Sequence, residues 1–296
     1  MNTRFAATAL AIFGGVAALL LPGTGLAGNV GYYTGCFEPG SVKAPLITQA
    51  GHTPVAVANL TPASFATLGT LVLENCNGSS LADQVNADVA TAVANGMTLV
   101  VYDWNPNGST ASQLPGAPAA TIVSGGGNQV DLAAGSPIAT GPGGTLTNSS
   151  LDGGSSSNHG YATSIPNGSI PLVTTATPTQ VIGFSYTYGA GRVVYSAIPF
   201  DCYARVGGAC DFTAAAPGIR SYFVNVLAWS GGSASTTCAS EGYTGLKLDW
   251  CRNICEKDYT GTQLKIWIRR WMDRYHDLPY CMREDEETPP QEQGKF

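Results

Sequence analysis

The sequence has 296 residues, a formal net charge of −6 and only 11% charged residues. An acidic balance without a concentrated basic patch excludes a nucleic-acid-binding surface. The hydrophobic content of 44% is typical of a chain that buries a substantial core.

The first 27 residues have the pattern of a secretory signal peptide. Arg4 precedes an apolar run from Phe5 to Leu21, and small residues follow as far as Ala27, after which we expect cleavage. The apolar run is slightly long, so an uncleaved membrane anchor is the alternative. No later segment is long and apolar enough to cross a bilayer. The mature protein is therefore expected outside the cytoplasm: secreted, periplasmic or on the cell surface.

The number of cysteines agrees with export. An even number of cysteines in an exported chain predicts disulfides. A zinc site is disfavoured because no Cys-x-x-Cys pair is present and the histidines are scattered. We expect no metal and no other cofactor. The eight cysteines are Cys36, Cys76, Cys202, Cys210, Cys238, Cys251, Cys255 and Cys281.

Charge density divides the chain into parts. Charged residues are sparse up to Thr237 and dense from Cys238 onward, and a Ser/Gly-rich stretch precedes the change. This pattern predicts an α/β domain over 28–230, a linker over 231–237 and a Cys-rich helical hairpin over 238–281. An acidic, disordered tail is predicted over 282–296.

In chain order, the elements of the larger domain alternate between strands and helices. Periodicity predicts strands at 30–33, 54–58, 70–74 and 97–102, and helices at 42–50 and 81–95. The alternation predicts a parallel sheet with helices on both faces. The Gly/Ser/Pro/Asn-rich stretch at 105–168 predicts loops and short strands. A hairpin is then expected from 180–186 and 192–198, and a last helix from Pro217.

Three segments resemble a known family. They are Thr70-Leu-Val-Leu-Glu-Asn-Cys-Asn-Gly78, Gly96-Met-Thr-Leu-Val-Val-Tyr-Asp103 and Tyr188-Gly-Ala-Gly-Arg-Val-Val-Tyr-Ser196. With the order of elements, they look like the class I glutamine amidotransferase-like fold, and more narrowly its secreted bacterial relatives. The resemblance covers most of residues 29–230. It implies a flavodoxin-like, three-layer α/β domain, and it implies little about activity because this fold hosts both enzymes and inert descendants.

The sequence departs from the family where the chemistry would be. Active amidotransferases of this class carry a cysteine on the turn after the strand at 97–102, whereas this chain reads Asp103-Trp104-Asn105. Cys76 is the nearest thiol, but it lies one strand too early and lacks the first glycine of a nucleophile elbow.

A structural role suits the first four cysteines better. In a flavodoxin-like strand order the first and third strands are neighbours, so Cys36 and Cys76 follow them at the same edge of the sheet. This predicts a Cys36–Cys76 disulfide. Cys202 and Cys210 are predicted to close a small loop.

His159 is the catalytic candidate. A histidine in a Gly/Ser-rich loop can act as a general base near neutral pH, although most loop histidines are simply solvated. Asp103, Asp152 or Asp201 could orient its ring, and the serines at 155–157 could supply a hydroxyl. No sequence spacing ties these groups together.

The C-terminal segment contains a small repeat, Tyr-Thr-Gly-x-x-Leu, beginning at Tyr243 and at Tyr259. Thr244 and Thr260 are natural N-caps for helices at 244–258 and 260–276. One face of the second helix is apolar, which is explained by core packing; the alternative is a partner-binding surface. The segment also resembles short Cys-rich modules of secreted bacterial proteins. The candidate partner-binding residues are Trp267, Arg270, Trp271 and Arg274.

The four cysteines of the hairpin permit three connectivities. Helix lengths and chain reach favour Cys251–Cys281 with Cys238–Cys255. The strongest rival is Cys238–Cys281, which would force a bond between Cys251 and Cys255 within one helix.

These observations favour a secreted, non-catalytic binding or structural protein. Its amidotransferase-like domain lacks the nucleophile, and its hairpin would attach it to a protein or a cell-envelope glycan. The alternative is an extracellular hydrolase that uses His159 with a nearby carboxylate.

Overall fold

The computed structural model describes residues 28–35, 40–76, 80–154, 156–205, 207–231, 238, 243, 245–255, 257, 259 and 261–282. The predicted signal peptide, nearly all of the predicted linker and nearly all of the predicted tail lie outside these ranges. No helix within them is long and apolar enough to span a membrane.

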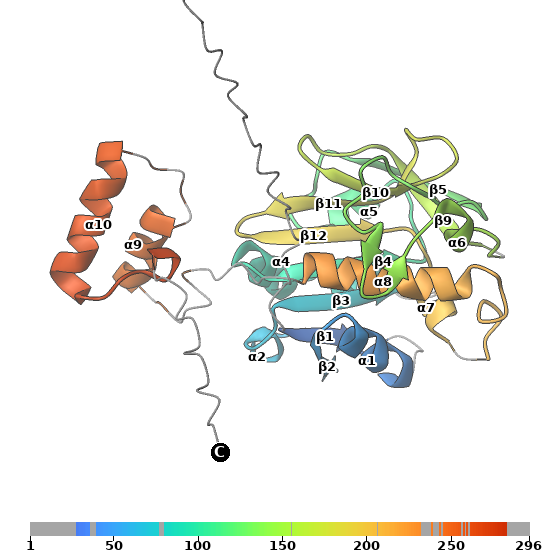
Figure 1. The fold of residues 1–296 in the computed structure, drawn as a ribbon, viewed down its shortest axis with the longest axis horizontal. Helices are drawn as coiled ribbons and strands as arrows, with labels where there is room; N and C mark the ends of the chain where they lie inside the picture. Colours follow the sequence, from blue (N-terminus) through green and yellow to red (C-terminus); the bar gives the residue numbers. More distant parts are fainter. Residues whose placement is uncertain are drawn as a thin grey trace, which may run out of the picture.

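A mixed ten-stranded sheet forms the centre of the larger unit (Figure 1). The strands of the described residues, of which all but β7 and β8 belong to this sheet, are β1 (Asn29–Tyr33), β2 (Thr53–Val57), β3 (Thr70–Asn75), β4 (Thr98–Asp103), β5 (Thr121–Gly127), β6 (Asp131–Leu132), β7 (Thr140–Gly141), β8 (Gly144–Thr145), β9 (Asn158–Ser164), β10 (Ile170–Thr174), β11 (Val181–Tyr188) and β12 (Gly191–Ser196). Five of them run parallel in the order β2-β1-β3-β4-β12. β7 and β8 form a separate two-stranded sheet.

Antiparallel strands extend the sheet beyond β12. β11 pairs with β12, β10 with β11 and β6 with β10, while β9 pairs with both β11 and β5. The predicted hairpin is confirmed: Gly189 and Ala190 join β11 to β12, and so short a connection permits only antiparallel pairing. The predicted parallel sheet is therefore confirmed at the centre, and antiparallel strands beyond the predicted hairpin extend it further than the sequence indicated.

The larger unit has helices around this sheet, and the C-terminal hairpin has helices of its own. They are α1 (Gly40–Gln49), α2 (Pro62–Phe65), α3 (Leu81–Gln84), α4 (Ala87–Ala94), α5 (Thr110–Gln113), α6 (Asn148–Leu151), α7 (Phe200–Ala204), α8 (Ala216–Ser230), α9 (Gly245–Cys255), α10 (Gly261–Tyr275) and the 3-10 helix η1 (Tyr280–Met282). Every residue of β3 and β4 is buried, so both faces of the central sheet are covered. α1 packs against α8, whereas α4 packs against α2 and β12.

The predicted helix at 81–95 is two helices. Asn86 interrupts it, because its side-chain oxygen accepts a hydrogen bond from the backbone N–H of Val89 at 3.0 Å and caps α4. Ser80 caps α3 in the same way, through Asp83 N–H. Short polar side chains that bond to nearby backbone compete with a continuous helix, and here the cap prevails.

The two C-terminal helices have a core of their own. Cys238, Tyr243, Cys251, Ile254 and Trp271 form a cluster separate from the core of the sheet. Trp271 is fully buried, and its indole Nε1 donates a hydrogen bond to the carbonyl of Asp277 at 2.7 Å. Trp271 is therefore a core residue, which corrects its assignment to a partner-binding surface.

The disulfides of this hairpin are Cys238–Cys251 and Cys255–Cys281. The predicted pairs, Cys238–Cys255 and Cys251–Cys281, are wrong. The sequence-based prediction measured the return of the chain from the very start of the first helix. Instead, the chain returns beside Lys247, whose Nζ lies 3.1 Å from Asp277.

This return point brings Cys255 within reach of Cys281. Cys255 is eight residues beyond Lys247, or about 12 Å along the helix axis. The four residues from Asp277 to Cys281 span up to about 13 Å. Cys281 therefore reaches Cys255, and Cys238 pairs with the cysteine one turn earlier.

The separate cores lead to a prediction about truncation. A chain ending at residue 235 should keep a cooperative thermal unfolding transition, because few contacts tie the hairpin to the sheet. We expect its Tm within about 4 °C of the 28–296 chain, the shift that about 1 kcal/mol produces in a domain of this size. Differential scanning calorimetry of both chains checks this. A broad, non-cooperative transition in the truncated chain would show that the hairpin belongs to the core.

Candidate functional site at the carboxyl edge of the sheet

The carboxyl edge of the parallel strands is where open α/β sheets bind ligands. Here it is organised by Asp103, the last residue of β4. The Asp103 side chain is completely buried. Its Oδ1 accepts hydrogen bonds from Asn75 Nδ2 at 2.6 Å and from the backbone N–H of Asn105 at 2.9 Å. Its Oδ2 accepts from Tyr195 Oη at 3.0 Å and Thr110 Oγ1 at 3.4 Å.

These bonds join four segments. Asn75 ends β3 and lies in register with Asp103, while Tyr195 comes from β12, on the other side of β4. Burial raises the pKa of Asp103, although its four hydrogen bonds oppose the shift. A carboxylate enclosed in this way cannot approach a substrate. The Asp103 carboxylate at the end of β4 is therefore a structural anchor.

A buried ion pair lies at the same end of β3. Lys43 Nζ, from α1, is 2.6 Å from Glu74 Oε2, and both side chains are almost fully buried. Burial raises the pKa of Glu74, against the effect of the neighbouring ammonium group. The pair fixes α1 to β3 and has no access to a ligand.

An open pocket lies just beyond Asp103. Trp104 and His159 meet edge to face in its wall, with ring centroids 4.4 Å apart. Asn105, Asn107 and Ser124 add exposed amide and hydroxyl groups. The remaining lining residues are Pro106 and Gly126. No carboxylate or ammonium group is among these lining residues.

His159 lies on β9, not in a loop as predicted. Its backbone N–H donates to Ala197 O at 2.9 Å, and its ring Nδ1 lies 2.7 Å from Trp104 O. Gly160 lets β9 lie close to the turn that contains Trp104 and Pro106, because a Cβ at this position would lie 2.6 Å from Pro106 Cγ. A carbonyl oxygen only accepts, so Nδ1 donates this hydrogen bond, and in the neutral form of the ring Nε2 carries the lone pair.

The predicted catalytic partners do not gather around His159. Asp103 is enclosed in its own network, and Asp152 Oδ1 accepts from Val130 N–H at 2.8 Å. Asp201 lies on α7. Among the described residues, the one hydrogen bond of the His159 ring goes to a carbonyl and not to a carboxylate.

The candidate hydroxyls do not meet His159 either. Ser157 Oγ donates to Asn128 O at 3.4 Å, and Ser156 Oγ to Asn158 O at 3.5 Å. Ser155 lies outside the described residues. In the part of the chain that the structure describes, neither Ser156 nor Ser157 is hydrogen-bonded to the His159 ring.

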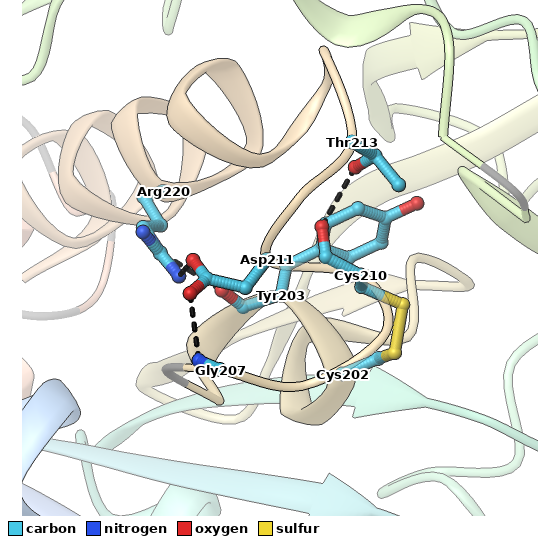
Figure 2. Close-up of polar contacts among 7 residues, drawn as sticks. All are labelled: Cys202, Tyr203, Gly207, Cys210, Asp211, Thr213 and Arg220. Carbon is cyan, nitrogen blue, oxygen red and sulfur yellow. Dashed lines mark hydrogen bonds and ion pairs between the residues drawn. A yellow bond between two sulfur atoms is a disulfide. The ribbon is translucent and has the colours of Figure 1, made fainter.

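The cysteines of the larger unit are structural. Cys76 is disulfide-bonded, while Cys36, its predicted partner, lies outside the described residues. The Cys202–Cys210 disulfide closes the loop after α7 (Figure 2). Arg220 of α8 anchors that loop by pairing with Asp211 and by donating from Nε to Tyr203 O at 2.8 Å. The N–H of Gly207 and the Arg220 guanidinium lower the pKa of Asp211.

Part of the predicted hairpin surface is accessible. Arg270 and Arg274 are exposed on α10, and Trp267 is half-buried. The guanidinium of Arg270 lies 4.9 Å from the centre of the Trp267 ring, and that of Arg274 lies 5.9 Å from the centre of the Trp250 ring. A partner-binding role for these three residues stays a prediction.

Sequence reasoning missed Trp104 as a pocket residue. It recorded this residue only as a substitute at the nucleophile position. A better signal was available: an aromatic residue directly after a buried parallel strand lies at the edge where such sheets bind ligands.

Comparisons with known proteins do not assign a family. No family model and no curated protein matches the sequence. A provisionally assigned GMP synthase component from Thermoplasma acidophilum is 12% identical with a TM-score of 0.42, covering 68% of this chain and 94% of that one. The cytoplasmic protein STM1381 of Salmonella typhimurium LT2 is 14% identical with a TM-score of 0.42, covering 67% and 98%. The cytoplasmic protein STM3548 of Salmonella typhimurium is 9% identical with a TM-score of 0.41, covering 68% of this chain and 97% of that one. At TM-scores below 0.5, the fold rests on the strand pairing described above.

The Asp103 network predicts different outcomes for two substitutions. Asp103→Ala leaves four donors without their acceptor, three of them on buried residues, and should cost about 3 kcal/mol of unfolding free energy. Asp103→Asn keeps Oδ1 for the two N–H donors, and its amide can donate to the two hydroxyl oxygens. We expect it to cost about 1 kcal/mol. Urea denaturation of the three proteins at pH 7 measures both values, and equal costs would contradict the network.

The raised pKa of Asp103 also predicts a pH dependence. Between the unfolded pKa of about 3.9 and the higher folded pKa, the folded state binds more protons than the unfolded state. The unfolding free energy of the wild type therefore falls as pH rises through this window. Asp103→Asn lacks this loss, so its deficit against wild type should shrink from pH 3 to pH 7. A deficit that grows over the same range would show that the folded pKa is lowered.

Because Cys76 is in a disulfide, thiol reagents should not label the folded, oxidised protein. Mass spectrometry after iodoacetamide treatment, without and with a reductant, measures the number of labels. Stoichiometric labelling of Cys76 without a reductant would restore it as a candidate nucleophile.

Proposed function

We propose that this protein is a secreted, non-catalytic binding protein whose α/β unit binds carbohydrate in the pocket beside Trp104 and His159. The observation that carries the proposal is the arrangement after β4. The Asp103 carboxylate is enclosed by four hydrogen bonds, whereas the next residue, Trp104, forms the wall of an open pocket. The edge that would perform chemistry in the resembled amidotransferase family thus offers a binding surface.

The chemistry of the pocket favours an uncharged ligand rich in hydroxyl groups. An indole ring combines a large apolar surface with a polar N–H, which suits the C–H faces and hydroxyls of a pyranose. Asn105 Nδ2 and Asn107 Nδ2 each donate one internal hydrogen bond, to Cys76 O and Asn105 O, and each keeps a second N–H for a ligand, while Ser124 adds a hydroxyl. With no carboxylate or ammonium in the lining, nothing there selects for a charged ligand.

His159 completes the set as an acceptor. Its Nδ1 proton is engaged by Trp104 O, so Nε2 can accept a hydrogen bond from a ligand hydroxyl. A hydrolase would need a nucleophile or a carboxylate beside this ring. None contacts it among the described residues, and binding is therefore preferred to catalysis by His159.

Export and attachment belong to the same proposal. The signal-peptide pattern and the disulfides support a secreted protein, because disulfides persist in oxidising compartments. The amidotransferase-like, flavodoxin-like domain would be a descendant without its nucleophile. The hairpin would attach the protein to a protein or an envelope glycan through the surface of Trp267, Arg270 and Arg274.

The proposal is tested by isothermal titration of the oxidised 28–296 chain with chitohexaose, cellohexaose and mannohexaose. We expect at least one to bind, and Trp104→Ala to weaken that binding by at least about tenfold. Phe212→Ala is the matched control, because Phe212 is 82% exposed just after the disulfide-closed loop and lies outside the pocket. Its affinity should equal that of the wild type.

Two results would overturn the proposal. One is the absence of binding to all three oligosaccharides. The other is the appearance of shorter oligosaccharides after incubation, with their loss in His159→Ala, which would establish the hydrolase instead.

A further inference from the structure

Three sulfur atoms lie unusually close together in the hairpin. The Sγ atoms of Cys238, Cys251 and Cys255 are all within 4.8 Å of one another. Two of them form the Cys238–Cys251 disulfide, and the third belongs to the Cys255–Cys281 disulfide. Cys251 and Cys255 are one turn apart on α9, which holds their sulfurs on the same side of the helix.

The two disulfides differ in access. Cys238 and Cys251 are fully buried in the hairpin core. Cys255 is half-buried, and Cys281 is exposed. An external thiol therefore reaches the second disulfide and not the first.

From this arrangement we infer that the hairpin is a thiol–disulfide exchange site, in which an external thiol acts on the exposed disulfide and Cys255 transfers the exchange to the buried one. The co-substrate is a thiolate, and the inference is independent of carbohydrate binding. Exchange proceeds by attack of a thiolate on a disulfide sulfur, so a sulfur held beside another disulfide is placed to continue the reaction.

The steps balance. An external thiolate attacks Cys281 Sγ; its S–S bond forms, the bond to Cys255 breaks, and the electron pair leaves on Cys255 as a thiolate. That thiolate attacks Cys238 Sγ, forming Cys238–Cys255 and releasing Cys251 as a thiolate. A second external thiolate then attacks the mixed disulfide at Cys281 and releases the Cys281 thiolate. In total, two external thiols are oxidised to a disulfide and one protein disulfide is reduced, and both freed cysteines take up protons.

Removing Cys281 tests the central step without an external thiol. Cys281→Ser leaves Cys255 as a free thiol within 4.8 Å of both sulfurs of the buried disulfide. At pH 8 we expect more than about a tenth of the molecules to contain a disulfide to Cys255 in place of Cys238–Cys251. Trypsin cleaves after Lys247, Arg252 and Lys257, which separates Cys238, Cys251 and Cys255 into distinct peptides for mass spectrometry after acid quenching and thiol blocking.

The matched control is Cys255→Ser. It also breaks the exposed disulfide and leaves one thiol, but that thiol is Cys281, which lies outside the three-sulfur cluster. Its peptide map should contain Cys238–Cys251 alone. Equal rearrangement in both variants would show that exchange needs no positioned sulfur and would overturn the inference, as would the absence of rearrangement in Cys281→Ser.

The wild-type chain supplies a test that does not depend on a variant's folding. Glutathione at pH 8 should first produce a mixed disulfide on Cys281, followed by molecules that contain Cys238–Cys255. Reduction that yields only free thiols, with no Cys238–Cys255 peptide at any time point, contradicts the inference.

Discussion

The carboxyl edge of the sheet depends on one buried carboxylate. Burying a charge is costly unless hydrogen bonds replace its water, so Asp103 is tolerated only while its donors stay in place. Those donors come from β3, from the turn after β4, from α5 and from β12. If any one of these donors moved away, the buried Asp103 side chain would lose a hydrogen bond that water could not replace. The network therefore fixes the ends of β3, β4 and β12 relative to one another. Trp104 directly follows β4, and the His159 ring is hydrogen-bonded to Trp104 O, so the positions of both depend on this network.

The Lys43–Glu74 pair imposes a similar constraint on the other side of β3. Buried ion pairs contribute little net stability, because desolvation offsets their attraction. Their effect is to penalise arrangements in which either charge lacks its partner. Lys43 and Glu74 thus fix how α1 meets β3, as Asp103 fixes how β3, β4 and β12 end together. Apolar contacts alone would give several packings of these strands and of α1 nearly the same free energy. The buried charges disfavour the packings in which they lack their partners.

The sequence predicts the centre of the sheet well and its surroundings less well. β3 and β4 contain the apolar runs 71–73 and 99–102, each strand follows shortly after a glycine, and burial on both faces leaves little ambiguity. The sequence predicts the β11–β12 hairpin but not the pairing of β5 with β9. These two strands are rich in glycine, serine and threonine, and their stability comes from pairing with neighbours rather than from their own periodicity. His159 lies on β9, so its position on a strand could not be predicted from the sequence for the same reason.

The pairing of the hairpin cysteines shows a different limit. Chain-reach arithmetic distinguishes alternatives only when their lengths differ by more than the uncertainty of a helix end, and Cys251 and Cys255 differ by a single turn. The contact that brings Cys255 within reach of Cys281 is tertiary: it is the Lys247–Asp277 ion pair, which no local sequence pattern predicts. The short distance between Cys251 and Cys255 also has a chemical consequence. Two sulfurs one turn apart are near-equivalent partners for Cys238, so exchanging one for the other leaves the hairpin's first segment tied to the same face of α9. Tyr243, Ile254 and Trp271, the rest of this small core, can then remain packed while the covalent connection changes.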